Sequence, residues 1–349
     1  MRLLRHILFL VNLIVAVLLL LSTMADAVSP SRFVILSLLS YAFLPLLIVN
    51  VVFALLWIFF KRWQCLLSIV VIALRFSTVL LCFQIGGTSE AKVGDGDETL
   101  KVMTFNVHGF VGRDGTLKTR EGAVTFIGIL RQQQPDVICV QEYNSVKHIN
   151  LADTIKALGY RYRYSARKPI GSEVLFSRYP IVGSSTLDSH NKYYADIKVH
   201  GRTVRVTGVH LASYRLNDKD LSTVERVVHG KADNEALNIV QKLRSTVIAH
   251  EGEWNESIKP MLSSYEGPMI MMGDFNDIPT SYLHSQVSKF LVDTFTEHGR
   301  GLGTTYHGDF PVYRIDYIFH SRDLKALSYQ RIKTDISDHY PVVAVFSLN

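Results

Sequence analysis

Two parts of the chain differ in how their hydrophobic residues are spaced. The first 85 residues contain three long apolar runs, at residues 7–21, 33–60 and 65–85. Each run is near or above the length that crosses a bilayer as a helix. From residue 100 onward the apolar runs are short, rich in β-branched residues and bounded by polar clusters, which is typical of buried strands. The pattern predicts an N-terminal transmembrane helical segment followed by a domain that contains a sheet.

The second part alternates between expected strands and expected helices, which predicts the α/β class. Helices are expected at residues 120–134 and 233–262, and the glycine-rich, polar residues 86–99 are expected to form a flexible linker. The predicted domains are therefore a membrane anchor of two to three transmembrane helices at 1–85, the linker at 86–99 and a folded domain at 100–349. The expected strands cover residues 100–105, 137–140, 174–176, 204–209, 269–272, 315–319 and 341–346.

The net charge of +6 belongs almost entirely to the membrane segment. Residues 1–85 carry six basic side chains and one acidic one, which leaves 31 basic and 30 acidic side chains beyond them. The folded domain thus lacks the global basic excess of many nucleic-acid binders, although a local basic groove would not show in this count. Cys65, Cys82 and Cys139 are too few for a disulfide framework, and Cys139 lies in an apolar run that predicts a buried thiol.

Basic residues around the apolar runs predict the orientation of the anchor. Arg2 and Arg5 precede the first run, and Lys61 and Arg62 separate the second from the third. By the positive-inside rule both groups stay on the cytoplasmic side, so the third run exits and the folded domain faces outside the cytoplasm. A cleaved signal peptide at the first run would give the same final orientation. Arg75 falls near the centre of the third run, where we expect it to be shielded from lipid or to reach the interface.

Polar clusters follow most of the expected strands, and their order along the chain is informative. They read F-N-V-H-G (105–109), Q-E (141–142), S-R-Y-P-I (177–181), V-H-L (209–211), G-D-F-N-D (273–277), R-I-D-Y-I-F (314–319) and S-D-H-Y-P-V (337–342). Together the series resembles the endonuclease/exonuclease/phosphatase family of deoxyribonuclease-like and sphingomyelinase-like metal-dependent phosphoesterases. The resemblance covers the whole folded part and implies a four-layer α/β sandwich, in which two stacked β-sheets are flanked by helices and the site lies at one edge.

Phosphoester hydrolysis needs a cation near the phosphate oxygens, a positioned water and relief of charge on the departing oxygen. Glu142 follows a hydrophobic strand and is a hard oxygen ligand of the kind that Mg²⁺ or Mn²⁺ accepts. The resemblance implies that Glu142 is the principal metal ligand, that Asn106 assists it, and that Asp338 lies near the metal or binds it through water.

Asp274 and Asn276 are two residues apart, so in an extended segment their side chains point to the same side. The alternative is a simple turn, because G-D-F-N-D with Pro279 close behind has good turn chemistry. The resemblance implies that Asp274 orients or deprotonates the attacking water and that Asn276 hydrogen-bonds the phosphate.

Histidines complete the expected site. The resemblance implies that His339 binds a phosphoryl oxygen as an imidazolium and that Asp316 holds this ring and favours its protonated form. His210 is expected to contact the substrate on the leaving-group side, with Glu173 as its partner. His108 stands where some DNA-repair relatives carry an acidic or amide residue, so it either contacts the phosphate or lines the loop.

These residues predict a membrane-anchored, Mg²⁺- or Mn²⁺-dependent hydrolase of phosphoesters that acts by direct water attack. The substrate stays open between a phospholipid head group or small phosphodiester and a nucleic acid, because the motifs are shared across the family. A non-catalytic binding protein on the same fold is a third alternative, and no protein partner is predicted. Residues 160–168 interleave tyrosines and arginines, as single-strand binders do, but their alternation more simply places tyrosines on a core face and arginines in water.

Overall fold

The computed structural model describes most of the chain, and the chain falls into two units. A helical unit comprises Met1–Cys82, Tyr214–Gly252 and Ile278–Gln286, and a sheet unit comprises Phe83–Ser213, Glu253–Asp277 and Val287–Asn349. Residues 89, 91–93 and 95–97 of the expected linker lie outside the described residues. The described residues are 2–88, 98–144, 150–166, 172–187, 191–214, 234–308 and 313–349, with single residues at 90, 94, 146, 220, 222 and 223.

The first sheet of the sheet unit is mixed. Its central strands β1 and β2 run parallel, and the remaining neighbours pair antiparallel. Across the sheet the strands are β11 (Lys325–Arg331), β12 (Val342–Ser347), β1 (Thr99–Asn106), β2 (Val137–Gln141), β4 (Val174–Ser177) and β3 (Tyr162–Ser165).

The second sheet repeats this plan with one parallel pair, β7 and β8, among antiparallel neighbours. In each sheet the parallel pair brings the carboxyl ends of two strands to the same edge. Across the sheet the strands are β5 (Ile181–Thr186), β6 (Lys192–Val199), β7 (Arg202–His210), β8 (Met269–Asp274), β10 (Asp316–His320) and β9 (Val292–Asp293).

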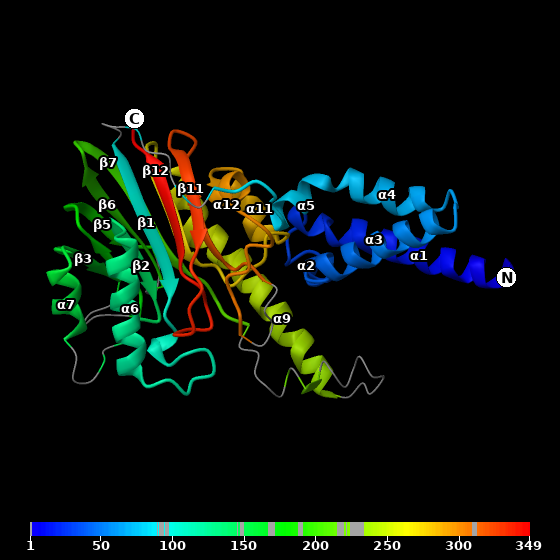
Figure 1. Cartoon of the computed structure of the whole chain (residues 1–349), viewed down its shortest axis with the longest axis horizontal. Helices are drawn as coiled ribbons and strands as arrows, with labels where there is room; N and C mark the ends of the chain where they lie inside the picture. Colours follow the sequence, from blue (N-terminus) through cyan, green and yellow to red (C-terminus); the bar gives the residue numbers. More distant parts are fainter. Residues whose placement is uncertain are drawn as a thin grey trace. The chain divides into compact units, whose positions relative to one another are not determined.

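Alternation along β1 shows how the layers form. Leu100 and Val102 are buried in a core that contains residues of both sheets. Met103 and Phe105 belong to a second core, which β1 and β2 share with α6 (Thr119–Gln133) and α7 (Leu151–Ala157). Those two helices lie along the first sheet in Figure 1. Two sheets flanked by helices confirm the predicted α/β sandwich.

Of two further sequence predictions for this part, one is confirmed and one needs correction. The segment expected to be helical at 233–262 is helical from residue 234 to 263, as α9 (Asn234–Glu253), a π-helical turn (Trp254–Ile258) and α10 (Lys259–Ser263). Along residues 160–166 the predicted alternation holds for Tyr160, which is buried, and Tyr164, which packs against the core. Tyr162 is 38% exposed, so the third tyrosine does not face the core.

Among the residues that the structure describes, one helical segment, Arg2–Asp26, which contains α1, is long and apolar enough to cross a membrane. Two further pairs, α2 with α3 and α4 with α5, qualify if each is taken as one span, although they bend by 62° and 68°. The anchor of two to three transmembrane helices and its boundary at residue 85 stay predictions. The helices are α1 (Arg2–Ser22), α2 (Val34–Ser40), α3 (Phe43–Phe59), α4 (Cys65–Leu74) and α5 (Phe76–Cys82).

Polar side chains inside these apolar helices bond to one another. Trp57 Nε1 donates to Asn12 Oδ1 (3.0 Å), and Asn12 Nδ2 donates to Ser68 Oγ (2.8 Å). Ser68 Oγ in turn donates to Asn50 Oδ1 (3.1 Å). The network joins α1, α3 and α4, as polar residues do where neither water nor lipid can satisfy them.

Arg75 lies at the break between α4 and α5. Its Nη2 donates to the carbonyl of Thr23 (2.8 Å) and lies 3.6 Å from the Asp26 carboxylate. A backbone acceptor and an acidic side chain thus contact the Arg75 guanidinium, and its shielding from lipid stays a prediction.

Segments from the second half of the chain also pack in the helical unit. The Glu251 carboxylate, near the end of α9, accepts the backbone N–H of Ser31 (2.7 Å) and the hydroxyl groups of Ser29 and Ser31. Thr280 donates its hydroxyl to the carbonyl of Ser40 (3.2 Å). The loops that flank α2 are thus fixed by residues far along the sequence.

Candidate active site

The ends of neighbouring strands carry most of the expected site residues. Asn106 ends β1, His210 ends β7 and Asp274 ends β8. Asp316 begins β10, which runs antiparallel to β8, so it lies at the same edge. In register, Asp274 pairs with His210 on one side and with Asp316 on the other. The topology therefore sets Asp274 between two other polar residues at a single level of the sheet.

The backbone turns sharply just after strands β1, β2 and β8. Glu142 follows β2 with φ +53°, Asn276 follows β8 by two residues with φ +49°, and His108 follows β1 by two residues with φ +45°. Left-handed backbone costs energy for residues other than glycine, and asparagine tolerates it best. Such strain concentrates where a fold must aim side chains, which supports a functional role for this edge.

Gly273 allows β8 to approach β7 directly before Asp274. A Cβ at Gly273 would stand 1.8 Å from the carbonyl oxygen of Val209, and the backbone there has φ +152°. Since no side chain fits, glycine at this position sets the depth at which Asp274 sits.

Asn106 joins the two sheets across the site. Its Nδ2 donates to Glu142 Oε1 (2.9 Å) and to Asp274 Oδ2 (3.0 Å), and its Oδ1 accepts the backbone N–H of His108 (3.0 Å). Asp274 is 1% exposed, and its Oδ1 accepts the backbone N–H of Asn276 (2.8 Å). Asn276 Nδ2 donates to the carbonyl of Leu211 (3.1 Å). The amide and carboxylate groups expected in the site therefore form one bonded cluster.

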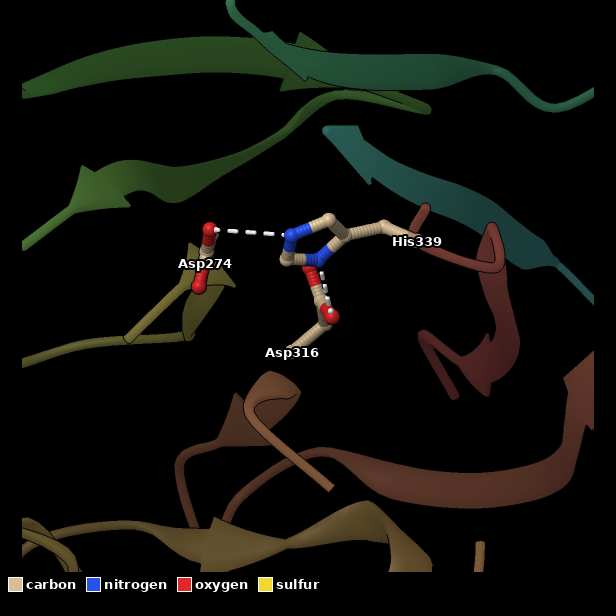
Figure 2. Close-up of side chains that lie close together, drawn as sticks. All are labelled: Asp274, Asp316 and His339. Atoms are coloured by element: carbon tan, nitrogen blue, oxygen red, sulfur yellow. Dashed lines mark hydrogen bonds and ion pairs between the residues drawn. The ribbon is translucent and has the colours of Figure 1, made fainter. Parts of the chain in front are cut away.

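Two histidines face Asp274, and each is held by a carboxylate from behind. His339 Nδ1 donates to Asp316 Oδ2 (2.9 Å) while its Nε2 lies 3.8 Å from Asp274 Oδ2, as Figure 2 shows. His210 Nδ1 donates to Glu173 Oε1 (2.8 Å), and its Nε2 also lies 3.8 Å from Asp274 Oδ2. The structure thus brings Glu173 to His210, as the resemblance implied.

The carboxylates set the protonation of both rings. Burial alone would lower the pKa of His339, but the charges of Asp316 and Asp274 outweigh it and raise that pKa to about 10. Burial also opposes protonation of His210, whose pKa is nevertheless raised by Glu173 and Asp274. Burial raises the pKa of Asp274, and the nearby His339 charge counteracts this. His339 is consequently an imidazolium at neutral pH.

The donor set fits a hard divalent ion at Glu142 better than at the buried cluster. Asp274, Asp316 and His339 each offer a ligand atom within 4.8 Å of the others. These three side chains are buried, however, and the hard ions that prefer oxygen ligands usually retain several waters. The Glu142 side chain is 38% exposed, and Asn106 Oδ1 keeps a second lone pair beside it. This arrangement suits Mg²⁺ or Mn²⁺, which retain several waters.

Asp338 and His108 contact each other. His108 Nδ1 lies 3.3 Å from Asp338 Oδ1 and 3.1 Å from the carbonyl of Gly112. The side chain of His108 is partly exposed. Because its Nδ1 faces Asp338 and Gly112, its Nε2 points away from both of them. The metal role of Asp338 and the substrate role of His108 stay predictions.

Two serines were not identified as site residues from the sequence. Ser337 Oγ donates to the carbonyl of Asn106 (2.7 Å) and accepts the backbone N–H of His339 (3.1 Å). Ser172 donates its hydroxyl to Glu173 Oε2. Ser337 stands inside the S-D-H motif, where its position next to Asp338 could have indicated a supporting role; Ser172 carries no such signal.

Two sequence models of known families match parts of this chain. The sequence model described as the Endonuclease/Exonuclease/phosphatase family matches residues 103–339. A domain of unknown function matches residues 5–80. No curated protein matches the chain.

Solved structures share the fold. The human Nocturnin catalytic domain with a bound sulfate anion is 19% identical, with a TM-score of 0.51 over 71% of this chain and 94% of that one. An AP endonuclease from Archaeoglobus fulgidus is 16% identical, with a TM-score of 0.48 over 71% of this chain and 99% of that one. An endonuclease/exonuclease/phosphatase from Beutenbergia cavernae DSM 12333 is 19% identical, with a TM-score of 0.47 over 72% of each chain. Since the family model covers more than half of the sequence, the chain belongs to the endonuclease/exonuclease/phosphatase family and is a metal-dependent phosphoric ester hydrolase.

Proposed function

We propose that the protein is a membrane-anchored phosphodiesterase that uses Mg²⁺ or Mn²⁺ and direct attack by water. The observation that carries this proposal is the shared target of the two histidines: Nε2 of His339 and Nε2 of His210 each lie 3.8 Å from Asp274 Oδ2. Asp316 holds the His339 ring, Glu173 holds the His210 ring, and both rings face the Asp274 carboxylate. This arrangement can bind a phosphoryl group between the oxygen that attacks it and the oxygen that departs.

The residues divide the chemistry among them. His339, kept cationic by Asp316, binds a phosphoryl oxygen and stabilises the charge that develops there. Asp274 orients the attacking water and accepts its proton, and its raised pKa makes it a better base than an exposed aspartate. Asn276 contacts the phosphate, and His210, held by Glu173, acts at the departing oxygen.

Glu142, Asn106 and Asp338 would hold the divalent ion. When bound, such an ion neutralises charge on the phosphoryl group. His108 would extend this side of the site through its contact with Asp338. Because Asn106 bonds both Glu142 and Asp274, it fixes the metal-binding side relative to the residue that handles water.

We further propose that the anchor is integral to the membrane and that the catalytic part faces outside the cytoplasm. The length and apolar character of α1 support the first point. Arg2, Arg5, Lys61 and Arg62 support the orientation. The near-neutral charge of the remaining sequence favours a phospholipid head group or small phosphodiester as substrate. An extracytoplasmic nuclease is the alternative that experiment must separate.

The test is hydrolysis by the full-length protein in detergent or vesicles, with Mg²⁺, Mn²⁺ or EDTA. The substrates are sphingomyelin vesicles, bis-p-nitrophenyl phosphate, plasmid DNA and RNA. We expect metal-dependent turnover of the first two that is lost in His339→Ala and retained in Asp196→Asn, since Asp196 pairs with Arg205 outside the site. Turnover of DNA or RNA alone, falling steeply with salt, would establish the nuclease instead. No metal-dependent turnover on any of them would contradict the proposed activity.

A further inference from the structure

One segment without an assigned role connects the two stretches that supply Asp316 and His339. Thr305 is fully buried, and its Oγ1 accepts the backbone N–H of Ile315 (3.0 Å) and that of Asp316 (3.0 Å). The carbonyl of Thr305 accepts the backbone N–H of Tyr340 (2.7 Å). One residue is therefore bonded both to Asp316 and to the immediate neighbour of His339.

The residues that follow Thr305 continue this contact. Tyr306 forms an isolated β-bridge with His339, and the two rings meet edge to face with centroids 5.2 Å apart. The backbone N–H of His307 donates to the carbonyl of Asp338 (2.8 Å). Residues 305–307 thus bond along the whole 338–340 stretch.

The Asp316 carboxylate depends on this support. Its Oδ2 accepts His339 Nδ1, whereas its Oδ1 is buried and has no hydrogen-bond partner among the residues that the structure describes. A carboxylate held through one oxygen keeps its direction only if its own backbone is fixed. Besides the pairing of β10 with β8, Thr305 contributes to that fixation, because a hydroxyl oxygen can accept two hydrogen bonds and both acceptor positions are used here.

Threonine is suited to this position because its side chain carries a hydroxyl oxygen that accepts the two N–H groups. Valine has the same shape but no acceptor, so Thr305→Val would leave the buried N–H of Asp316 and the partly buried N–H of Ile315 without their partner. Serine keeps the oxygen and loses only a methyl group. The chain therefore offers a substitution that removes the two bonds and another that retains them.

We propose that Thr305 is a positioning residue that holds Asp316 in the direction that orients the His339 ring. This role rests on the proposed function, in which His339 binds the phosphoryl group. Thr305 itself does not touch substrate. Its loss misdirects the imidazolium and lowers the rate of the chemical step more than it weakens substrate binding.

Steady-state kinetics of the full-length protein on bis-p-nitrophenyl phosphate give the first readout. We expect Thr305→Val to lower kcat by about 10- to 100-fold, since displacing a catalytic group slightly has effects of this size. KM should change far less, and Thr305→Ser should restore most of kcat. The matched control is Thr207→Val, which removes another fully buried hydroxyl whose contact is Met261 Sδ (3.9 Å). Equal kcat in the two valine variants would overturn the proposal, and so would an equal loss in Thr305→Ser.

A second readout does not depend on turnover. In protein labelled with ¹⁵N-histidine, the Nδ1 proton of His339 bonded to Asp316 should give a low-field NMR signal, which His339→Ala assigns. We expect Thr305→Val to shift or broaden this signal and Thr207→Val to leave it unchanged. If Thr305→Val does not fold, Thr305→Cys, which keeps a weak acceptor, replaces it in both measurements. An unperturbed signal would refute the positioning role even if activity fell. A perturbed signal without turnover in the parent protein would support it and would count against the proposed function alone.

Discussion

Replacing Asp316 with asparagine removes one charge from behind His339 and keeps the size of the side chain. Asp316 is 1% exposed, and its Oδ2 accepts His339 Nδ1 at 2.9 Å. A hydrogen bond to a charged group contributes about 1.5–3 kcal/mol. Asparagine can still accept this bond but removes the Asp316 charge, which is the largest of the effects that raise the pKa of His339 to about 10. At about 1.4 kcal/mol per pKa unit, loss of that charge lowers the pKa by roughly one to two units.

The direction in which activity changes with pH follows from the protonation state of the His339 ring that is active. The imidazolium is the active form, so activity is full below the pKa of His339 and declines as the pH rises through it. In the parent enzyme this decline should be centred near pH 10. In Asp316→Asn it should move to lower pH. Near neutral pH the variant ring is still charged, and the remaining loss of kcat there measures misorientation alone.

The assay is kcat and KM for bis-p-nitrophenyl phosphate as a function of pH, at saturating Mg²⁺. With a shift of one to two units from a pKa of about 10, we expect the ratio of parent to variant kcat to grow between neutral pH and about pH 9 by roughly 2- to 10-fold. Asp196→Asn makes the same substitution in a carboxylate paired with Arg205 outside the site (2.7 Å), so its profile should follow the parent. A variant profile parallel to that of the parent at every pH would refute the assignment of Asp316 as the group that maintains the His339 charge.

Further predictions concern the metal, the close approach of strands and the leaving group. Glu142→Gln should raise the Mg²⁺ concentration for half-maximal rate by at least about 10-fold, and an unchanged Mg²⁺ titration would place the ion elsewhere. Gly273→Ala should destabilise the protein by several kcal/mol, on the order of an overpacked core, because its Cβ would meet a backbone oxygen at 1.8 Å. The control, Gly128→Ala, meets no atom within 4 Å and should leave the melting temperature unchanged or higher. Glu173→Gln should weaken His210 and lower kcat more for a substrate with an alkoxide leaving group than for one that releases p-nitrophenolate; equal losses would contradict a leaving-group role.

Strands that are buried on both faces were predictable because their apolar runs are continuous. Residues 269–272 are all apolar, and β8 (Met269–Asp274) is buried along its whole length. The same holds for β2 (Val137–Gln141). Polar residues end these runs sharply, so both the strand and its site residue could be read from the sequence.

The strands that were missed lack a continuous apolar run, as β5, β6 and β11 show. In β6 (Lys192–Val199), Lys192 is buried and paired with Glu253 (3.0 Å), which lies 61 residues away. Asp196 in the same strand is paired with Arg205 of β7. β5 is an edge strand that alternates between exposed and half-buried positions, and β11 is interrupted by an irregularity near Ala326. The partner that allows Lys192 to be buried is distant in sequence, so local periodicity cannot reveal that β6 is a strand.

The types of site residue could be predicted, but their partnerships depend on distance in sequence. His210 and Glu173 are 37 residues apart, and His339 and Asp316 are 23 apart. Asp338 was expected near the metal, and the structure pairs it with His108. The hydroxyl of Thr305 gave no signal at all, because a threonine that accepts two backbone N–H groups looks like any other buried threonine.

The convergence on Asp274 depends on register, and this is why topology and chemistry cannot be separated here. Asp274 pairs with His210 across β7 and β8 and with Asp316 across β8 and β10. A slip of one residue in β8 would turn the Asp274 side chain to the opposite face of the sheet. Gly273 disfavours that slip, because any other residue at its position would place a Cβ against the carbonyl oxygen of Val209. Gly273 thus fixes the level at which both histidines face Asp274.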